Sequence, residues 1–312
     1  MTNIQEVNQV AQALLGTVAG YEGAFEGAYN IRQDSGCAGR RSTQNIRIES
    51  KPDGKPGLEI HVAPGTRDER VYIPAVVTHS HVHDLAYNDF FIGAGAKVTI
   101  VAGCGVHTSE GAESSHDGIH RFYLGAGSEV LYEEKHIGTG EGVGNRRINP
   151  VTECFLEEDA SLTMETSQLG GVSYTDRKTT AHLKARAKLI VRERLLTDGQ
   201  EEAKTYFDVV LQGEDAGCDL VSRSVAKGNS RQSFISRIVG EARCHGHSAC
   251  DAILADNAVV TAAPQLDALS PDAALIHEAA IGKIAGEQIL KLRTLGLTEE
   301  EAEARIVAGF LK

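Results

Sequence analysis

The sequence predicts a mainly β protein: a right-handed parallel β-helix, flanked by a short N-terminal helix and a C-terminal helical segment. Three observations support this fold class. Short runs of alternating polar and apolar residues fill the region from 45 to 265, small-residue turns precede several of them, and the runs return about every 30 residues. No long helical pattern lies between the runs, which argues against a doubly wound α/β fold. Periodicity alone leaves a β-sandwich open.

The N-terminal region reads as a helix followed by a linker. Residues 3–19 place apolar side chains at helical spacing, including Val7, Val10, Leu14 and Val18, and Gly20 is a suitable stop. Residues 21–44 are polar and rich in glycine, which predicts a loop. We therefore assign residues 1–44 to an N-terminal helix and linker.

The central region, residues 45–270, is predicted to be the β-helix core domain. Strand patterns occur at 45–49, 58–62, 97–101, 129–132, 161–164, 188–191 and 219–221. Small-residue turns lie at 93–96, 125–128, 158–161, 186–187 and 215–217. The first apolar positions after these turns are Val98, Val130, Leu162, Leu189 and Leu220, at intervals of 32, 32, 27 and 31 residues. Such a repeat is typical of a solenoid.

The C-terminal segment, residues 271–312, is predicted to be helical. An apolar stripe runs from Leu275 to Leu295, and Gly296 ends it. Thr298 followed by Glu301 forms a capping box for a second helix, which is expected to bury Ala302, Ile306 and Phe310.

Composition excludes several classes of protein. Lys and Arg number 31 against 43 Asp and Glu, a net charge of −12 that argues against a nucleic-acid binder. The N-terminus shows neither a basic region nor a continuous apolar run, and no apolar stretch reaches about 18 residues, so neither a secretory signal nor a membrane span is expected. Six cysteines without a Cys-x-x-Cys pair fit neither a disulfide scaffold nor a zinc ribbon. A reducing, cytoplasmic location is expected.

Nucleotide and hydrolase motifs are missing from the sequence. It contains no P-loop, so ATP hydrolysis is not expected in this chain, and no Gly-x-Ser-x-Gly elbow. The glycine-rich run at 138–144 does not match the dinucleotide fingerprint and is expected to be a flexible loop.

The densest group of possible metal ligands runs from Cys244 to Cys250 and also contains two histidines. Thiolate and imidazole suit iron, zinc or copper. In a strand, alternation sends only some of these side chains to one side, so further ligands must come from elsewhere, and His277 with Glu278 could supply them. A buried structural cysteine is the alternative reading of Cys250.

Two weaker groups complete the candidates. His79, His81 and His83 would share one face of a strand and could bind a metal, although the polar face of an exposed strand is the commoner explanation. Glu133, Glu134 and His136 are expected to be surface charges.

The C-terminal third resembles a known family. Residues 248–254 read Ser-Ala-Cys-Asp-Ala-Ile-Leu, and residues 275–284 read Leu-Ile-His-Glu-Ala-Ala-Ile-Gly-Lys-Ile. Together with residues 287–288, 296–302 and 306–310, they resemble the core domain of the SufB/SufD family. Weaker similarity at 134–136 and 168–172 extends the resemblance to roughly residues 40–312.

The resemblance implies a scaffold for iron–sulfur cluster assembly, on which a transient cluster forms at the interface between two paired β-helices. Carried over by position, Cys250 matches the SufB-type interface cysteine. Glu278 matches the glutamate of the SufB-type His-Glu-Ala-Thr motif, and His277 matches the histidine that SufD-type chains contribute. Because one chain carries all three, a homodimer is expected to supply both halves of the site without a separate SufD.

The resemblance also implies a partner, a SufC-like ABC ATPase that docks on residues 278–312 and hydrolyses ATP. This chain is then a scaffold and not an enzyme. It is shorter than ordinary SufB, Ala280 stands where the motif commonly has Thr, and no cysteine for sulfur entry can be matched, so the sulfur donor stays open. The alternatives are a metal-binding or structural partner of an ABC ATPase, and a carbohydrate-active β-helix enzyme, against which the missing signal peptide and tryptophan argue.

Overall fold

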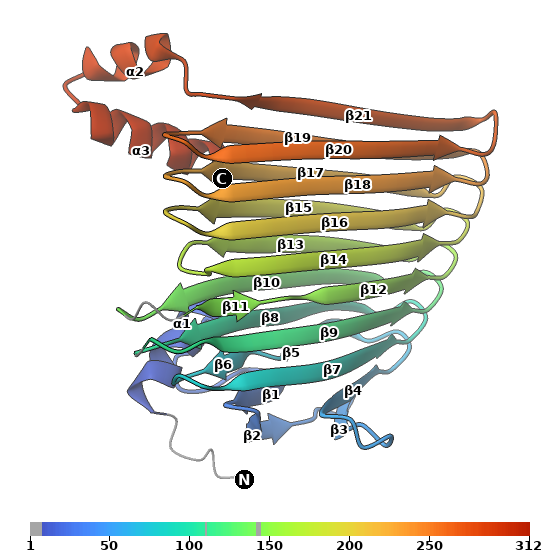
Figure 1. Cartoon of the computed structure of the whole chain (residues 1–312). Coiled ribbons are helices and arrows are strands. Elements are labelled where there is room, and N and C mark those ends of the chain that lie inside the picture. Colours follow the sequence, from blue (N-terminus) through green and yellow to red (C-terminus); the bar gives the residue numbers. More distant parts are fainter. Residues whose placement is uncertain (1–7, 110, 142–144) are drawn as a thin grey trace.

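The computed structural model describes residues 8–109, 111–141 and 145–312. Its strands stack into a parallel β-solenoid of about eight turns, with a helix near each end of the chain's path (Figure 1). The predicted parallel β-helix is therefore confirmed, and the β-sandwich is excluded. Within these ranges, no helix is both long enough and apolar enough to cross a membrane.

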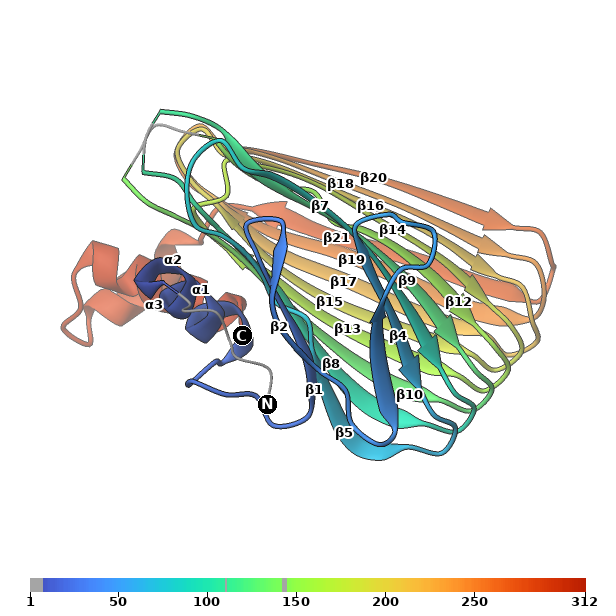
Figure 2. The same ribbon diagram turned by 90° about the horizontal axis from the view of Figure 1, so that it is seen from below.

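Two sheets form the walls of the solenoid (Figure 2). The first has the order β2-β1-β5-β8-β10-β13-β15-β17-β19-β21, with β6 beside β1 and β8. The second has the order β20-β18-β16-β14-β11-β9-β7-β4-β3, with β12 beside β9 and β14. Because the chain passes through each sheet once per turn, the strands from β4 onward pair in parallel and their side chains stack in columns, whereas β1–β2 and β3–β4 are antiparallel pairs at the N-terminal end.

The bounds of the strands in the first sheet are β1 (Ala28–Gln33), β2 (Gly36–Arg41), β5 (Arg67–Tyr72), β6 (Ala75–Val77), β8 (Lys97–His107), β10 (Glu129–Thr139), β13 (Ser161–Leu169), β15 (Lys188–Thr197), β17 (Gly217–Ala226), β19 (Cys244–Leu254) and β21 (Ala273–Gly282). Those of the second are β3 (Ile46–Ser50), β4 (Gly57–Val62), β7 (His83–Ile92), β9 (Ser114–Leu124), β11 (Arg146–Ile148), β12 (Val151–Leu156), β14 (Tyr174–Leu183), β16 (Glu202–Leu211), β18 (Arg231–Gly240) and β20 (Val259–Ala268).

The predicted small-residue turns form one corner of the solenoid. Gly95, Gly127, Asp159, Arg186 and Asp215 all have positive φ there. The backbone N–H of each donates to a carbonyl of the next turn, for example Gly127 to Glu158 at 2.9 Å and Arg186 to Glu214 at 2.8 Å. A residue in the left-handed backbone conformation therefore recurs once per turn at this corner, and its N–H group bonds to the neighbouring turn.

The repeat is confirmed with one correction. Val98, Val130, Leu162 and Leu189 are in register and buried in the core, as the spacing predicts. The next position in this column is Cys218, not Leu220, so the fourth interval is two residues shorter than predicted. Leu220 belongs to the neighbouring inward column.

The N-terminal helix is confirmed, but the linker is wrong. α1 (Gln9–Ala19) buries Leu14 and Val18 against the outer face of β8, where Gly103 leaves room because a Cβ would lie 2.6 Å from Val18. Val7 lies outside the described residues. Instead of a loop, residues 28–33 and 36–41 form the antiparallel pair β1 and β2, joined at Asp34 and Ser35, which have positive φ.

The C-terminal segment begins with a strand. Residues 273–282, predicted as helix, form β21, which pairs with β19 over its whole length. The helices are α2 (Gly286–Arg293) and α3 (Glu299–Phe310). The capping box of Thr298 and Glu301 is present, Ala302 is fully buried, and Ile306 and Phe310 are half-buried. α3 lies against the first sheet, where Glu303 pairs with Lys227 at 3.0 Å.

The prediction of a loop at the glycine-rich run is also affected. The run at 138–144 is not wholly a loop, because residues 138 and 139 end β10. Residues 142–144 lie outside the described residues.

Candidate functional site

Cys250 lies on β19 and points into the solenoid. It is 1% exposed and belongs to the hydrophobic core. Its neighbour in the inward column is Ser222 of β17, whose hydroxyl donates to Glu193 of β15 at 2.6 Å. Burial and then the charge of Glu193 raise the pKa of Cys250 to about 12. The thiol is therefore protonated at neutral pH until a metal displaces the proton.

His277 lies on β21, one strand above, and also faces inward. Its Nδ1 lies 2.7 Å from the hydroxyl of Ser248, which is its register partner on β19. Its Nε2 is buried and has no hydrogen-bond partner among the described residues. Burial and then the nearby His247 lower the pKa of His277, so the ring is held neutral with a nitrogen available as a ligand.

Glu278 is not brought to the same place. Strand alternation turns it outward, and 73% of its side chain is exposed. Its carboxylate lies 3.8 Å from Nε2 of His247, whose Nδ1 lies 2.7 Å from the carboxylate of Asp219. Within one chain, the structure thus places Cys250 and His277 on the inner face of neighbouring strands near the end of the solenoid and leaves Glu278 on the outer face.

The same alternation divides the group from Cys244 to Cys250. Cys244 and Cys250 face inward, whereas His245 and His247 face outward. Burial raises the pKa of Cys244, as it does for Cys250. The dense ligand group in the sequence therefore does not gather in one place.

The histidine triad at 79–83 does not form. Residues 79–81 make a turn in which His81 has a φ of 68°, and only His83 enters a strand, β7. The prediction that the three histidines share one strand face is therefore wrong, because the turn interrupts the strand alternation after His79.

A buried polar cluster was missed by the sequence analysis. Glu134 and His136, expected as surface charges, are buried inside the solenoid. Arg177 of β14 bonds Glu134 at 2.6 Å and lies 3.5 Å from Glu193, so one guanidinium bridges two buried carboxylates. Although burial alone would raise the pKa of Glu134, Arg177 and His136 lower it well below its usual value.

A second ion pair lies beside this cluster. Arg32 of β1 binds Asp84 at 2.6 Å, and His116 of β9 contacts the same carboxylate at 2.8 Å. Burial opposes ionisation of Asp84, but the hydrogen bonds from His116 and Arg32 outweigh it, so the pKa of Asp84 falls far below its usual value. Asp84 is therefore a carboxylate at any physiological pH.

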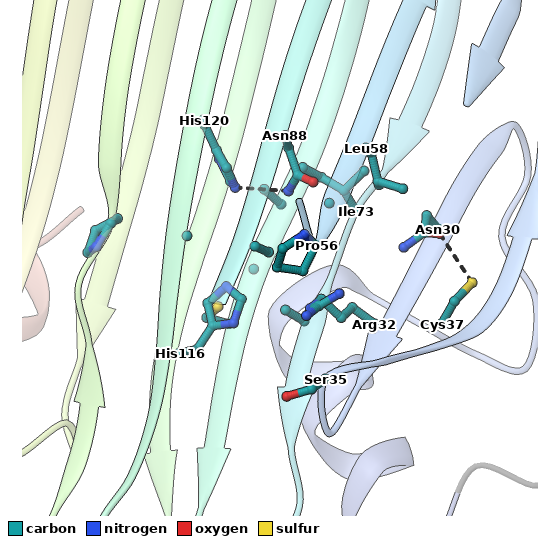
Figure 3. A pocket seen from close by; sticks show the side chains of 18 of the residues that line it. Asn30, Arg32, Ser35, Cys37, Pro56, Leu58, Ile73, Asn88, His116 and His120 are labelled. Carbon is teal, nitrogen blue, oxygen red and sulfur yellow. Dashed lines mark hydrogen bonds between the residues drawn. The ribbon is translucent and has the colours of Figure 1, made fainter. Parts of the chain in front are cut away.

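These groups border a cavity of about 260 Å³ between the two sheets (Figure 3). Its wall includes Cys104, His116, His120, Glu134 and His136. In Figure 3, His116 and His120 lie one above the other on the same strand, and His120 meets Asn88 across a hydrogen bond of 3.3 Å. Burial lowers the pKa of His120 to about 4, so this imidazole is neutral at physiological pH.

A signal for this cluster was present in the sequence. The i, i+2, i+4 spacing that drew attention to residues 79–83 also occurs in His116-x-Gly118-x-His120 and in Tyr132-x-Glu134-x-His136. In these strands it does place every member on the inner face. Among the described residues, however, no three His, Cys, Asp or Glu side chains already form a group able to hold a metal ion.

Comparison with known proteins assigns the family. Residues 82–310 match the model of the SufBD core domain of the SUF system for FeS cluster assembly. An iron-sulfur cluster assembly SufBD family protein of Methanothermobacter thermautotrophicus is 28% identical over 274 residues, which cover 85% of this chain and 61% of the relative.

Two further relatives carry the same description. One from Methanocaldococcus jannaschii is 25% identical over 86% of this chain and 85% of its own length. One from Pyrococcus horikoshii is 31% identical over 63% of this chain and 60% of its own length. The chain spans about three fifths of the first relatives, with 61%, 62% and 58% of their lengths covered. Because the family model covers most of the solenoid together with α2 and α3, this chain belongs to the SufBD family of iron–sulfur cluster assembly proteins.

Proposed function

We propose that this chain is a scaffold that pairs end to end with a second copy and holds a nascent iron–sulfur cluster at the junction. Cys250, His277 and Glu278 are the proposed ligands, and a SufC-like ABC ATPase is the proposed partner. Family membership supports the class of reaction. The observation that carries the proposed location is the uncapped end of the solenoid beside Cys250 and His277.

This end, which we call the open end, consists of β20 and β21. Each is the last strand of its sheet, so within the described residues neither has a strand on its outer side. Leu266 and Ile281 belong to inward columns, since their register partners Ile238 and Ala252 are buried, yet they are 37% and 40% exposed. Unpaired strand edges and exposed core side chains favour addition of further strands.

A second copy of the chain could both pair with the free strand edges and cover the exposed inward side chains. A two-fold axis at the open end would pair edge with edge and cover the exposed inward side chains of both copies. It would also bring two copies of His277, each with a buried unpartnered Nε2, close to the axis. Cys250 lies one strand further in, on β19.

Cluster ligation at Cys250 requires loss of the thiol proton. Because burial favours the neutral thiol, we expect iron binding itself to displace the thiol proton, so the thiol need not ionise beforehand. Thiolate is the usual ligand of iron–sulfur clusters, while imidazole and carboxylate bind more weakly and would favour later release of the cluster.

Glu278 can join Cys250 only if the last strands move. Cys250 is enclosed, and Glu278 faces the outside of the same sheet. A mechanical input at the open end is therefore part of the proposal: ATP-driven closure of the partner ATPase would twist the paired solenoids and expose the inner ligands.

The proposed docking surface for the ATPase lies within residues 278–312, on α2 and α3. α2 buries none of its residues, and the exposed fractions of Leu290 and Leu295 are 62% and 73%. Leu290 lies on α2 and Leu295 in the turn between α2 and α3, and exposed apolar side chains gathered in this way are typical of a binding surface. Ala302 and the Glu303–Lys227 pair attach α3 to the solenoid, so movement of the helices would be transmitted to the stack.

All six cysteines are free, which supports a reducing compartment such as the cytoplasm.

The test is anaerobic reconstitution with iron and sulfide, followed by visible absorption and measurement of acid-labile sulfide. We expect Cys250→Ser to lose the cluster absorption. Cys154→Ser is the matched control, because Cys154 is an equally buried thiol on the opposite sheet. Equal absorption in wild type and Cys250→Ser would remove Cys250 from the site and favour a purely structural partner of the ATPase.

A further inference from the structure

We propose that the cavity in the N-terminal half of the solenoid is a separate metal site, in which the imidazoles of His116 and His120 bind one divalent transition-metal ion. This proposal does not depend on cluster assembly at Cys250. The two places lie on β9 and β19, well apart along the stack (Figure 1).

The first argument is the space between the two imidazoles. His116 and His120 both face inward from β9, and Gly118 lies between them on the same face. A Cβ at Gly118 would lie 3.2 Å from Nε2 of His116 and 3.4 Å from Nε2 of His120. Both nitrogens therefore point toward the same small volume, which only the missing side chain of glycine leaves free.

The second argument is the proton arrangement of the two rings. Nδ1 of His116 is 2.8 Å from the Asp84 carboxylate, so this nitrogen donates to Asp84 and Nε2 is the atom turned toward the cavity. Nδ1 of His120 is 2.8 Å from the hydroxyl of Tyr132, whose own proton goes to Glu134 at 2.9 Å. Both rings are thus oriented with Nε2 toward the cavity, where Nε2 of His120 also lies 3.3 Å from the amide nitrogen of Asn88, a hydrogen bond that a bound ion would replace.

The third argument is the character of these supporting contacts. Metal-binding histidines typically donate their other N–H to a carboxylate or another fixed acceptor, which orients the ring and raises its basicity. Asp84 does this directly for His116, and is itself fixed by Arg32. Glu134, through Tyr132, does the same for His120, and is fixed by Arg177.

Imidazole ligands select the class of ion. They suit first-row transition metals such as Zn²⁺, Fe²⁺ and Co²⁺ and not Mg²⁺ or Ca²⁺, which prefer oxygen. An ion held between the two rings, beyond the Gly118 Cα, would require both Nε2 atoms to move toward it to reach the usual metal–nitrogen distance of about 2.1 Å. The 260 Å³ cavity leaves room for waters in the remaining coordination positions.

The experiment is a titration of the full chain with Co²⁺, without oxygen or sulfide, followed by visible absorption and equilibrium dialysis. We expect one Co²⁺ per chain in the wild type and none in the double variant His116→Gln/His120→Gln. Gly118→Ala is the decisive second variant. It keeps both histidines, and the new methyl meets only the movable ends of their rings, so the fold persists while the ion is excluded.

Two further variants complete the design. Asp84→Asn is expected to weaken Co²⁺ binding roughly 10- to 100-fold, because His116 loses its orienting carboxylate. Cys250→Ser and His79→Gln/His81→Gln are the controls and should bind as the wild type does. The proposal is overturned if the wild type binds no Co²⁺, if folded Gly118→Ala binds it undiminished, or if either control abolishes binding.

Discussion

At the scale of single residues, the interior charges of the solenoid are each matched by an opposite charge. Arg177 lies between Glu134 and Glu193, and Arg32 lies on Asp84. Removing one member of a buried pair leaves an uncompensated charge in a medium of low polarity. The residues around the cavity are therefore expected to be more sensitive to mutation than the many ion pairs on the surface.

Replacement of Arg177 by Met tests this expectation. The change leaves two buried carboxylates without their positive partner. We therefore expect the free energy of unfolding to fall by about 3–5 kcal/mol in a chemical denaturation experiment at pH 7. Arg186→Met is the matched control, because Arg186 pairs with Glu158 and Asp159 on the surface. A loss in Arg177→Met no larger than in this control would contradict the account of the interior.

His120 predicts a pH dependence of stability. Its folded pKa of about 4 lies below the ordinary 6.5, so between these values the unfolded chain binds more protons than the folded one. Its contribution is complete above pH 6.5 and is lost as the pH falls through 4, a loss of about 3 kcal/mol. We expect denaturation curves of His120→Gln to show a correspondingly weaker pH dependence over this range. Identical slopes in the two proteins would exclude His120 as the cause.

Single residues also show which side-chain positions could be predicted from the sequence and which could not. The inward position of Cys250 follows from strand alternation, but the outward position of Glu278 follows from the same rule only once residues 273–282 are known to be a strand. Glu134 was assigned to the surface because charged residues are rarely buried. Its partner, Arg177, is 43 residues away in the sequence, and only the stacking of turns brings the two together.

At the scale of elements, β21 shows how tertiary pairing overrides local pattern. Residues 273–282 are rich in alanine and carry apolar side chains that also fit a helical stripe. Pairing with β19 satisfies the backbone over ten residues and extends the inward columns, which an isolated helix could not do. By contrast, the corner turns and the strands they precede were predicted correctly, because a left-handed residue recurs at the same place in each turn.

The open end of the solenoid yields a prediction about oligomeric state. Ile281→Glu places a charge on the inward column of β21, where the second copy is proposed to pack, and we expect a monomer by size-exclusion chromatography with light scattering. Ile276→Glu is the matched control, because Ile276 is exposed on the outer face of the same strand and its change should leave a dimer. If both variants remain dimeric, pairing through this end is wrong.

At the scale of the whole molecule, the three proposed sites lie in different parts of the structure. The cavity lies in the N-terminal half, the proposed cluster ligands lie near the open end, and α2 and α3 lie outside the first sheet. Since each turn of a solenoid contacts mainly its neighbours, these regions are expected to tolerate separate alteration.

Deletion of residues 283–312 tests the proposed docking surface. The deletion removes α2 and α3 but keeps β21 and the open end. We expect the shortened chain to dimerise yet to lose co-purification with a SufC-like ATPase. The double variant Leu290→Ser/Leu295→Ser should weaken co-purification without removing the helices. Undiminished binding by the deleted chain would move the docking surface elsewhere.

In the proposed scaffold, the cluster forms between two chains at the open end. The most direct measurement is the acid-labile sulfide content per chain after anaerobic reconstitution of Ile281→Glu, in which Cys250 and His277 are intact. The account predicts a folded monomer that retains no cluster, while the Ile276→Glu dimer retains the wild-type amount. A monomer of Ile281→Glu with wild-type sulfide content would contradict it.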